Sequence, residues 1–260
     1  MSYTLFAGCS YTAGSGFELG TQEPALWCNQ LHQKLFNHTQ LLNVAKGGRS
    51  NANIFKDTVK AITHYPVEQA IVQWTSMPRY ELELGFELYN THQSFVPNGQ
   101  CRDHNLNDIN YSSQYLNKIK DRFTNLAHCQ HEIVTLIEYC NSIHRLCKLT
   151  NTKLYFVNGL CPWDQNFFDQ LMSVTPDQYT MYTQQILNTH NRDDQEIFQL
   201  YKKMHDQYAA AGGVNHLPWL NLYPSMKQCQ IDVNLDNMHP GIESNALYTK
   251  MFVKSITENF

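Results

Sequence analysis

Three short polar motifs in this 260-residue chain contain residues that could do chemistry. The first is Gly8-Cys9-Ser10, which follows an apolar strand pattern over residues 3–7 and leads into a glycine-rich turn. A serine hydroxyl on such a turn suits a nucleophile, because nearby backbone N–H groups can stabilise a developing oxyanion. Taken alone, a serine after a strand more often only forms a turn or caps a helix.

The second motif runs from Asp236 to Pro240 and contains His239. A carboxylate three residues before a histidine can lie in the same loop, hold the Nδ1–H of the imidazole and leave Nε2 free as a base. The alternative without a catalytic role is a histidine at the start of a helix, with an aspartate that only forms or caps the local turn. The motif therefore indicates a general base for a nucleophile only when other features support it.

The third motif is the glycine pair Gly47-Gly48, which follows a strand pattern over residues 41–45. Paired glycines at the end of a strand let the backbone approach a ligand and present an N–H group to it. They also occur simply to make a turn. The motif is not a phosphate-binding P-loop, because the Gly-Lys-Ser/Thr ending is missing.

The elements that position these motifs alternate between strand and helix. We expect strands at 3–7, 41–45, 70–74, 153–157 and 217–222, and helices at 24–36, 51–63, 128–149, 193–211 and 244–258. This alternation predicts an α/β fold, a three-layer α/β/α sandwich around a flavodoxin-like, doubly wound parallel sheet of about five strands. Ligands of such sheets bind outside the carboxyl ends of the strands, where the polar motifs all fall.

One domain spanning residues 1–260 is expected, because the length suits a single α/β domain and no repeat or linker interrupts it. Two stretches, at about 80–126 and 161–190, are polar and fit neither pattern. We interpret them as irregular insertions over one end of the sheet. Their aromatic and amide side chains would form the walls of a pocket, and they equally suit a packed polar surface.

Composition narrows the function further. The formal charge of −4 is mild and its signs are interspersed, so a nucleic-acid partner is not expected. No apolar stretch is long enough to cross a bilayer and no signal peptide is evident, which predicts a chain in the cytoplasm, of a host cell if phage-encoded, or in a virion. The eight cysteines are scattered without a CxxC pair, which indicates reduced thiols, no metal site and no cofactor.

Together the three motifs resemble the SGNH (GDSL-type) hydrolase superfamily, and specifically its divergent members that begin Gly-Cys-Ser-Tyr/Phe-Thr. In that family a serine follows the first strand, a glycine follows the second, and Asp-x-x-His precedes the last helix. The resemblance implies that Ser10 attacks an acyl carbon, that His239 takes its proton, and that Asp236 orients His239. It also implies that the N–H groups of Ser10 and Gly48 stabilise the oxyanion.

Two departures from the family pattern stand out. Cys9 replaces the usual aspartate of the first block, and strand alternation makes it a small buried thiol rather than a second nucleophile. The third block lacks its usual asparagine, so Thr75, Ser76 or Arg79 would have to supply the third oxyanion donor. Arg79 also fits a surface ion pair with a nearby glutamate.

The leading hypothesis is therefore a serine esterase that acts through an acyl-enzyme on a small-molecule or carbohydrate ester. A second hypothesis keeps the triad but transfers the acyl group to an acceptor other than water, as an O-acyltransferase. A third is a non-catalytic binding or structural module of a phage particle, favoured by the missing asparagine and by a composition rich in Asn, Gln and Tyr. The sequence contains nothing that indicates an oligomeric state.

Overall fold

The computed structural model describes residues 1–17, 22–75, 80–83, 92–95, 101–102, 126–159, 217–218, 225–227, 229–234, 236 and 239–259. The chain divides into two units. The first comprises Met1–Ser76, Tyr139–Asp164 and Asn215–Phe260, and the second comprises Met77–Glu138 and Gln165–Val214. All three polar motifs belong to the first unit.

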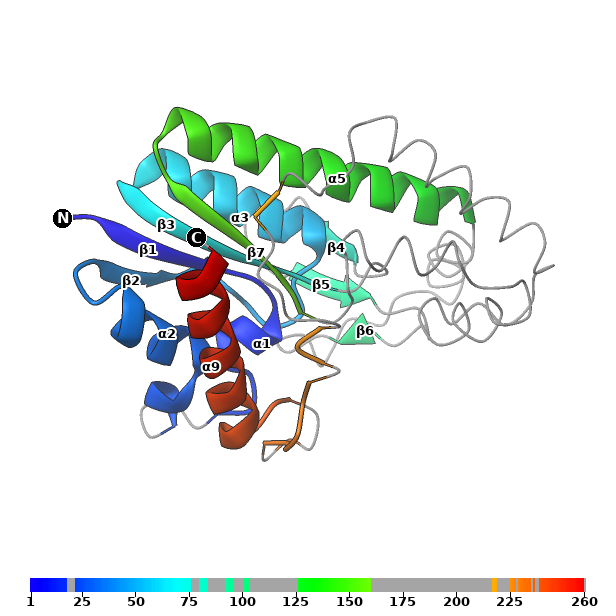
Figure 1. Cartoon of the computed structure of the whole chain (residues 1–260). Helices are drawn as coiled ribbons and strands as arrows, with labels where there is room; N and C mark the ends of the chain where they lie inside the picture. Colours follow the sequence, from blue (N-terminus) through cyan, green and yellow to red (C-terminus); the bar gives the residue numbers. More distant parts are fainter. Residues whose placement is uncertain are drawn as a thin grey trace. The chain divides into compact units, whose positions relative to one another are not determined.

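A parallel sheet with the strand order β2-β1-β3-β7 lies at the centre of the first unit (Figure 1). Its strands are β1 (Tyr3–Ala7), β2 (Gln40–Asn43), β3 (Val67–Trp74) and β7 (Lys153–Asn158). The chain leaves β1 for one neighbour, β2, and then crosses to the other neighbour, β3. This is the winding of a flavodoxin-like sheet, so the predicted α/β fold class is confirmed.

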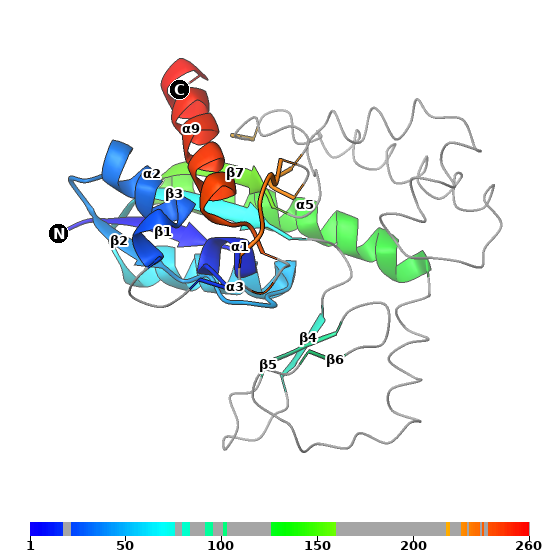
Figure 2. The same cartoon turned by 90° about the horizontal axis from the view of Figure 1, so that it is seen from below.

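Helices cover both faces of this sheet, as Figures 1 and 2 show. On one face lie α2 (Trp27–Leu35) and α9 (Ile242–Asn259). On the other lie α3 (Asn51–His64) and the part of α5 (Leu126–Leu149) that belongs to the first unit, from Tyr139 onward. The rings of Phe55 and Tyr139 join α3 to α5, stacked with centroids 4.3 Å apart. Two shorter helices, α1 (Ser10–Ala13) and the 3₁₀ helix η1 (Glu23–Ala25), connect β1 to α2.

The sequence patterns of these elements explain where they form. Residues 70–74 of β3 and 154–158 of β7 are buried and mostly apolar, as strands that are covered on both faces must be. α3 begins where the hydroxyl of Ser50 accepts the N–H of Asn53, at a distance of 3.3 Å. Its residues Ile54, Ala61 and Ile62 are buried at helical spacing, so one face of the helix packs on the sheet.

Trp27 is the largest side chain between the sheet and the α2–α9 layer, and it is fully buried. Its ring lies 5.5 Å from that of Phe6 in β1 and 4.9 Å from that of Phe252 in α9, measured between centroids. Its Nε1–H donates to the carbonyl of Tyr11 at 3.1 Å. A single side chain therefore ties the sheet, both helices and the turn after β1 together.

Part of the second unit differs from the sequence prediction. The segment 80–126, which we expected to be irregular, contains β4 (Tyr80–Glu83), β5 (His92–Phe95) and β6 (Cys101–Arg102), paired in an antiparallel sheet. These strands have at most four residues and mix polar with apolar side chains, so they show no clear period. The expected insertion at 161–190 and helix at 193–211 lie outside the described residues.

The expected fifth strand at 217–222 is described only at Leu217 and Pro218. There the carbonyl of Pro218 accepts the N–H of Phe156 at 2.9 Å. Phe156 belongs to β7, and its other neighbour in the sheet is β3. Residue 218 thus pairs with the outer edge of β7, which is where a fifth strand would lie.

Replacing Trp27 with alanine should destabilise the first unit strongly. The change leaves a large cavity and removes a buried hydrogen bond, so the free energy of unfolding should fall by about 3–5 kcal/mol. Urea denaturation followed by circular dichroism would measure it. Leu149→Ala is the control, because Leu149 is 86% exposed and its truncation should change the free energy by less than about 0.5 kcal/mol. Equal effects of the two changes would contradict this view of the core.

Candidate active site

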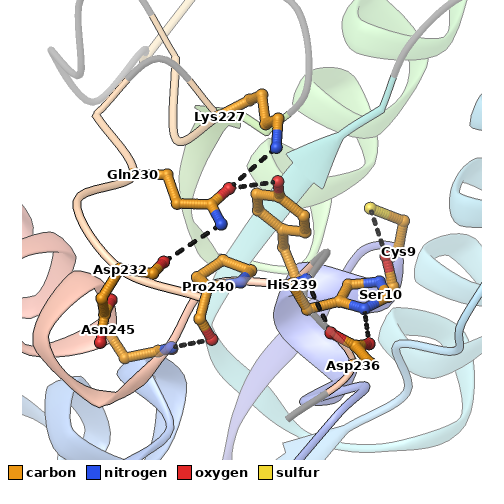
Figure 3. Close-up of polar contacts among 10 residues, drawn as sticks. Cys9, Ser10, Lys227, Gln230, Asp232, Asp236, His239, Pro240 and Asn245 are labelled. Carbon is orange, nitrogen blue, oxygen red and sulfur yellow. Dashed lines mark hydrogen bonds and ion pairs between the residues drawn. The ribbon is translucent and has the colours of Figure 1, made fainter. Parts of the chain in front are cut away.

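Asp236 and His239 form a bonded pair in the loop before α9 (Figure 3). One carboxylate oxygen, Oδ2, bonds to Nδ1 of His239, and the other, Oδ1, accepts the backbone N–H of His239 at 2.9 Å. The bond at Nδ1 assigns the proton to that nitrogen. Among the described residues Nε2 has no hydrogen-bond partner, which is the state required of a general base.

Ser10 is the first residue of α1 and follows Ala7, the last residue of β1, by three positions. The ring of its neighbour Tyr11 contacts the ring of His239 edge-on, with centroids 6.0 Å apart. The turn after β1 and the loop before α9 therefore lie side by side, although they are more than two hundred residues apart in the sequence. The structure brings together the two motifs that we singled out independently.

The Ser10 hydroxyl is directed at the sulfur of Cys9, 4.0 Å away, as Figure 3 shows. No hydrogen bond joins it to His239, although both residues are described. A rotation of the serine side chain would be needed before a proton could pass to Nε2. Hydrogen bonds between a nucleophile and its base are often long or unformed without substrate.

Gly16 supports the carboxylate of Asp236 from the other side. Its φ of +88° is one that residues with a side chain rarely adopt. A Cβ at this position would stand 2.8 Å from Oδ2 of Asp236, so only glycine lets the turn approach the carboxylate this closely. The side chains of Asp236 and His239 are 27% and 16% exposed, which leaves the pair accessible to a substrate.

Gly48 occupies the turn after β2, where the N–H of Arg49 donates to the carbonyl of Lys46 at 3.4 Å. Gly48 has a φ of +78°, whereas Gly47 has no positive φ. Gly48 is therefore the member of the pair whose backbone requires glycine. The Arg49 guanidinium is buried and lies 3.0 Å from the carboxylate of Asp57, which fixes the turn to α3.

Thr75 follows β3 and is fully buried. Its backbone is held at both groups by Asn51, whose Oδ1 accepts the N–H of Thr75 at 2.9 Å and whose Nδ2 donates to its carbonyl at 3.3 Å. The end of β3 is thereby fixed to the start of α3. The other two candidates for an oxyanion donor, Ser76 and Arg79, lie outside the described residues.

Two residues that position the site were not identified from the sequence. The side chain of Gln73 is fully buried beneath the turn that carries Ser10. Asp232 accepts the N–H groups of Glu243 at 2.9 Å and Ser244 at 2.7 Å, at the start of α9. An amide inside the apolar run of β3 is a signal that could have indicated Gln73, because a buried amide needs partners.

Asp232 anchors the loop that carries the Asp236–His239 pair. Its backbone carbonyl accepts the N–H of Gly241, and its carboxylate satisfies N–H groups that the first turn of a helix leaves unpaired. Partial burial raises the pKa of Asp232, but hydrogen bonds from Ser244 and Glu243 outweigh burial and lower that pKa below its usual value. Both ends of the loop are thus fixed to α9.

The thiols in the described part of the chain are mostly buried, and burial raises the pKa of Cys28 to about 12. Cys28 is therefore protonated at neutral pH and a poor nucleophile. In the same part of the chain, no group of three or more His, Cys, Asp or Glu side chains is placed to hold a metal ion. The described helices include none with the length and apolar character needed to cross a membrane.

No protein-family model and no curated protein matches this sequence. Solved structures match over almost its whole length. TesA has 9% identity and a TM-score of 0.47, and the match covers 98% of both chains. A member of the lipolytic protein G-D-S-L family from Veillonella parvula has 12% identity and a TM-score of 0.44, covering 99% of this chain and 100% of the other.

The psychrotrophic esterase EstA from Pseudoalteromonas sp. has 10% identity and a TM-score of 0.46, and the match covers 98% of this chain and 97% of the other. By name, the Veillonella protein belongs to the GDSL-type group that the sequence motifs resemble. Likenesses this distant do not indicate the activity of this chain, so its function has to be argued from the site itself.

Replacing Asp232 with alanine should weaken the attachment of the loop to α9. Because the pKa of Asp232 is lowered in the folded protein, its stabilisation is present above the unfolded pKa of about 4 and is lost as the pH falls through the folded value. At neutral pH, Asp232→Ala should lower the free energy of unfolding by about 1–2 kcal/mol. The difference from the wild type should shrink at about pH 3.

Urea denaturation at both pH values measures this difference. Glu258→Gln is the control, since Glu258 is an exposed carboxylate at the far end of the same helix. Its substitution should change the free energy by less than about 0.5 kcal/mol at either pH. A difference for Asp232→Ala that stays constant between the two pH values would show that its carboxylate does not act in this way.

Proposed function

We propose that this chain is a serine hydrolase that cleaves acyl esters through an acyl-enzyme. The observation that carries the proposal is the carboxylate of Asp236, which bonds to both the backbone N–H and Nδ1 of His239. This arrangement orients an imidazole with Nε2 available, beside a turn that presents a serine. Ser10 is the nucleophile, His239 the general base and acid, and Asp236 the orienting group.

In the first step the Ser10 hydroxyl rotates away from Cys9 toward His239. Its oxygen attacks the acyl carbon while its proton passes to Nε2, and the carbonyl oxygen becomes an oxyanion. The tetrahedral intermediate then collapses, the bond to the leaving alcohol breaks, and that alcohol takes the proton from Nε2. Water repeats the sequence on the acyl-enzyme, which releases the free acid and restores Ser10.

The oxyanion is stabilised by the backbone N–H groups of Ser10 and Gly48 in this proposal. Each such donor contributes about 3–4 kcal/mol to the stability of the transition state. The left-handed φ of Gly48 supports its choice over Gly47, because it sets the orientation of the peptide bonds on both sides. A third donor comes from Thr75, Ser76 or Arg79.

The proposed substrates are small-molecule esters, with O-acylated carbohydrates as one class. This choice follows the resemblance of the Ser10, Gly48 and His239 motifs to GDSL-type enzymes.

The experiment that tests the proposal uses a fluorophosphonate probe, which reacts with activated serines. The wild-type protein should be labelled at Ser10, as read by peptide mass. Ser10→Ala should abolish labelling, and His239→Ala should slow it by at least about a hundredfold, because the serine then lacks its base. Ser255→Ala, which changes a serine of α9 outside the proposed site, should be labelled like the wild type.

Absence of labelling, together with absence of short-chain aryl ester hydrolysis at neutral and mildly alkaline pH, would contradict the proposal. A second assay follows the acyl group when the ester is supplied together with sugar acceptors. Release of free acid in step with consumption of the ester is the expected result. Consumption without matching free acid would instead indicate an acyltransferase. Arg79→Ala tests the third donor, since a loss of activity is expected only if Arg79 contacts the oxyanion.

A further inference from the structure

We infer that Gln73 is a positioning residue that fixes the turn bearing Ser10, an inference that rests on the proposed role of Ser10 as nucleophile. Gln73 is the penultimate residue of β3 and its side chain is fully buried. β3 pairs with β1 in the sheet, so the side chain of Gln73 reaches the turn that follows β1. In the described part of the chain its hydrogen bonds go to neighbours of Ser10 in that turn and to Trp74, and none goes to Ser10 itself.

The oxygen of the Gln73 amide accepts from three groups of the turn. Oε1 accepts the backbone N–H of Cys9 at 3.3 Å, the hydroxyl of Thr12 at 2.7 Å and, more weakly, the thiol of Cys9 at 3.6 Å. Cys9 precedes Ser10, and Thr12 follows it by two residues within α1. The backbone just before the serine and a side chain two residues after it are therefore fixed to one atom of the sheet.

The nitrogen of the same amide is also bonded twice. Nε2 donates to the sulfur of Cys9 at 3.2 Å and to the backbone carbonyl of Trp74 at 3.2 Å. A glutamine amide has two donor hydrogens and an oxygen that accepts two bonds, so the capacity of Gln73 is fully used. The carbonyl of Trp74 can only accept and the N–H of Cys9 can only donate, so a flipped amide would lose both bonds.

Two glycines leave the space that this amide occupies. A Cβ on Gly159, which follows β7, would stand 1.7 Å from Nε2 of Gln73. A Cβ on Gly8, which follows β1, would stand 2.7 Å from Oε1. Any side chain at either position would displace the amide, so the backbone at the ends of two strands is shaped around Gln73.

Cys9 transmits this constraint to Ser10. The N–H of Cys9 is held by Gln73, and its carbonyl accepts the N–H groups of Thr12 and Ala13 at 3.1 and 2.9 Å. With both backbone groups of Cys9 engaged, the following peptide cannot rotate without breaking buried bonds. That peptide contains the N–H of Ser10 and sets the direction of its side chain, so Gln73 positions both the nucleophile and one proposed oxyanion donor.

Replacing Gln73 with glutamate makes this role measurable. A protonated carboxyl keeps the shape, one donor and the acceptor oxygen, but an ionised carboxylate cannot donate to the carbonyl of Trp74. The groups bonded to Gln73 are neutral, namely an N–H, a hydroxyl, a thiol and a carbonyl, so none of them is a cation that would pair with the charge. Burial should therefore raise the pKa of the introduced carboxyl.

The experiment compares fluorophosphonate labelling of Gln73→Glu, Gln73→Met and the wild type as a function of pH. At mildly alkaline pH both variants should react about tenfold to a hundredfold more slowly, because a displaced nucleophile loses its alignment. The deficit of Gln73→Glu should shrink as the pH falls, whereas that of Gln73→Met should not. Gln69→Glu is the matched control, since Gln69 lies at the other end of β3 and bonds to Thr4.

If Gln73 had a purely structural role, the labelling rate would fall only in proportion to the fraction of unfolded protein. The labelling rate of Gln73→Glu would then not recover at low pH. Thermal unfolding at each pH shows whether a variant is folded. If Gln73→Glu is unfolded, the wild type is compared with Gln73→Met, which adds no charge to the core. Labelling of both folded variants at the wild-type rate would overturn the inference.

Hydrogen exchange of the backbone N–H groups of residues 9–13 provides a readout that does not depend on catalysis. It should be faster in Gln73→Met than in the wild type, and unchanged in Gln69→Glu. If the wild type is not labelled at all, the proposed function fails, and exchange alone then decides whether Gln73 holds the turn. Unchanged exchange in Gln73→Met would refute the inference in that case as well.

Discussion

The buried hydrogen bonds between Gln73 and the turn after β1 are the interaction on which the geometry of the site depends. β1 lies between β2 and β3 in the sheet. The chain crosses from β1 to β2 on one side and then returns to β3 on the other side. The carboxyl ends of β1 and β3 therefore form the switch point at which such sheets bind ligands. Gln73 spans this point and fixes the turn after β1, and Tyr11 of that turn packs against His239.

The elements that the sequence predicted are those whose pattern is local. The second half of β3 is a buried and mostly apolar run, and α3 has a serine cap followed by apolar residues at helical spacing, so both could be identified within a few residues. β4, β5 and β6 could not, because each has four residues or fewer and acquires its partner through antiparallel pairing. For such short strands the pairing, which no local pattern encodes, decides the structure.

The same distinction separates the site residues. Asp236 and His239 are three residues apart, so their pairing could be inferred from spacing, and Ser10 from the turn around it. The bonds of Gln73 join residues 61 and 64 positions apart, and those of Asp232 reach 11 and 12 residues along the chain. Contacts over such separations depend on the assembled fold. The sequence motifs contain the groups that we propose to react but not the residues that hold them.

Glycines lie where the residues that hold the site contact the backbone of its turns. Four glycines around the site have a polar side chain from a distant residue where their own Cβ would stand. They are Gly8 and Gly159 against Gln73, Gly16 against Asp236, and Gly241 against Asp232. Each of these buried or partly buried polar side chains needs several hydrogen-bond partners. Many of those partners are backbone groups, so the side chain lies close to the backbone. The glycines are therefore best explained by the amide and carboxylates that press against them, and their positions mark where distant segments of the chain meet.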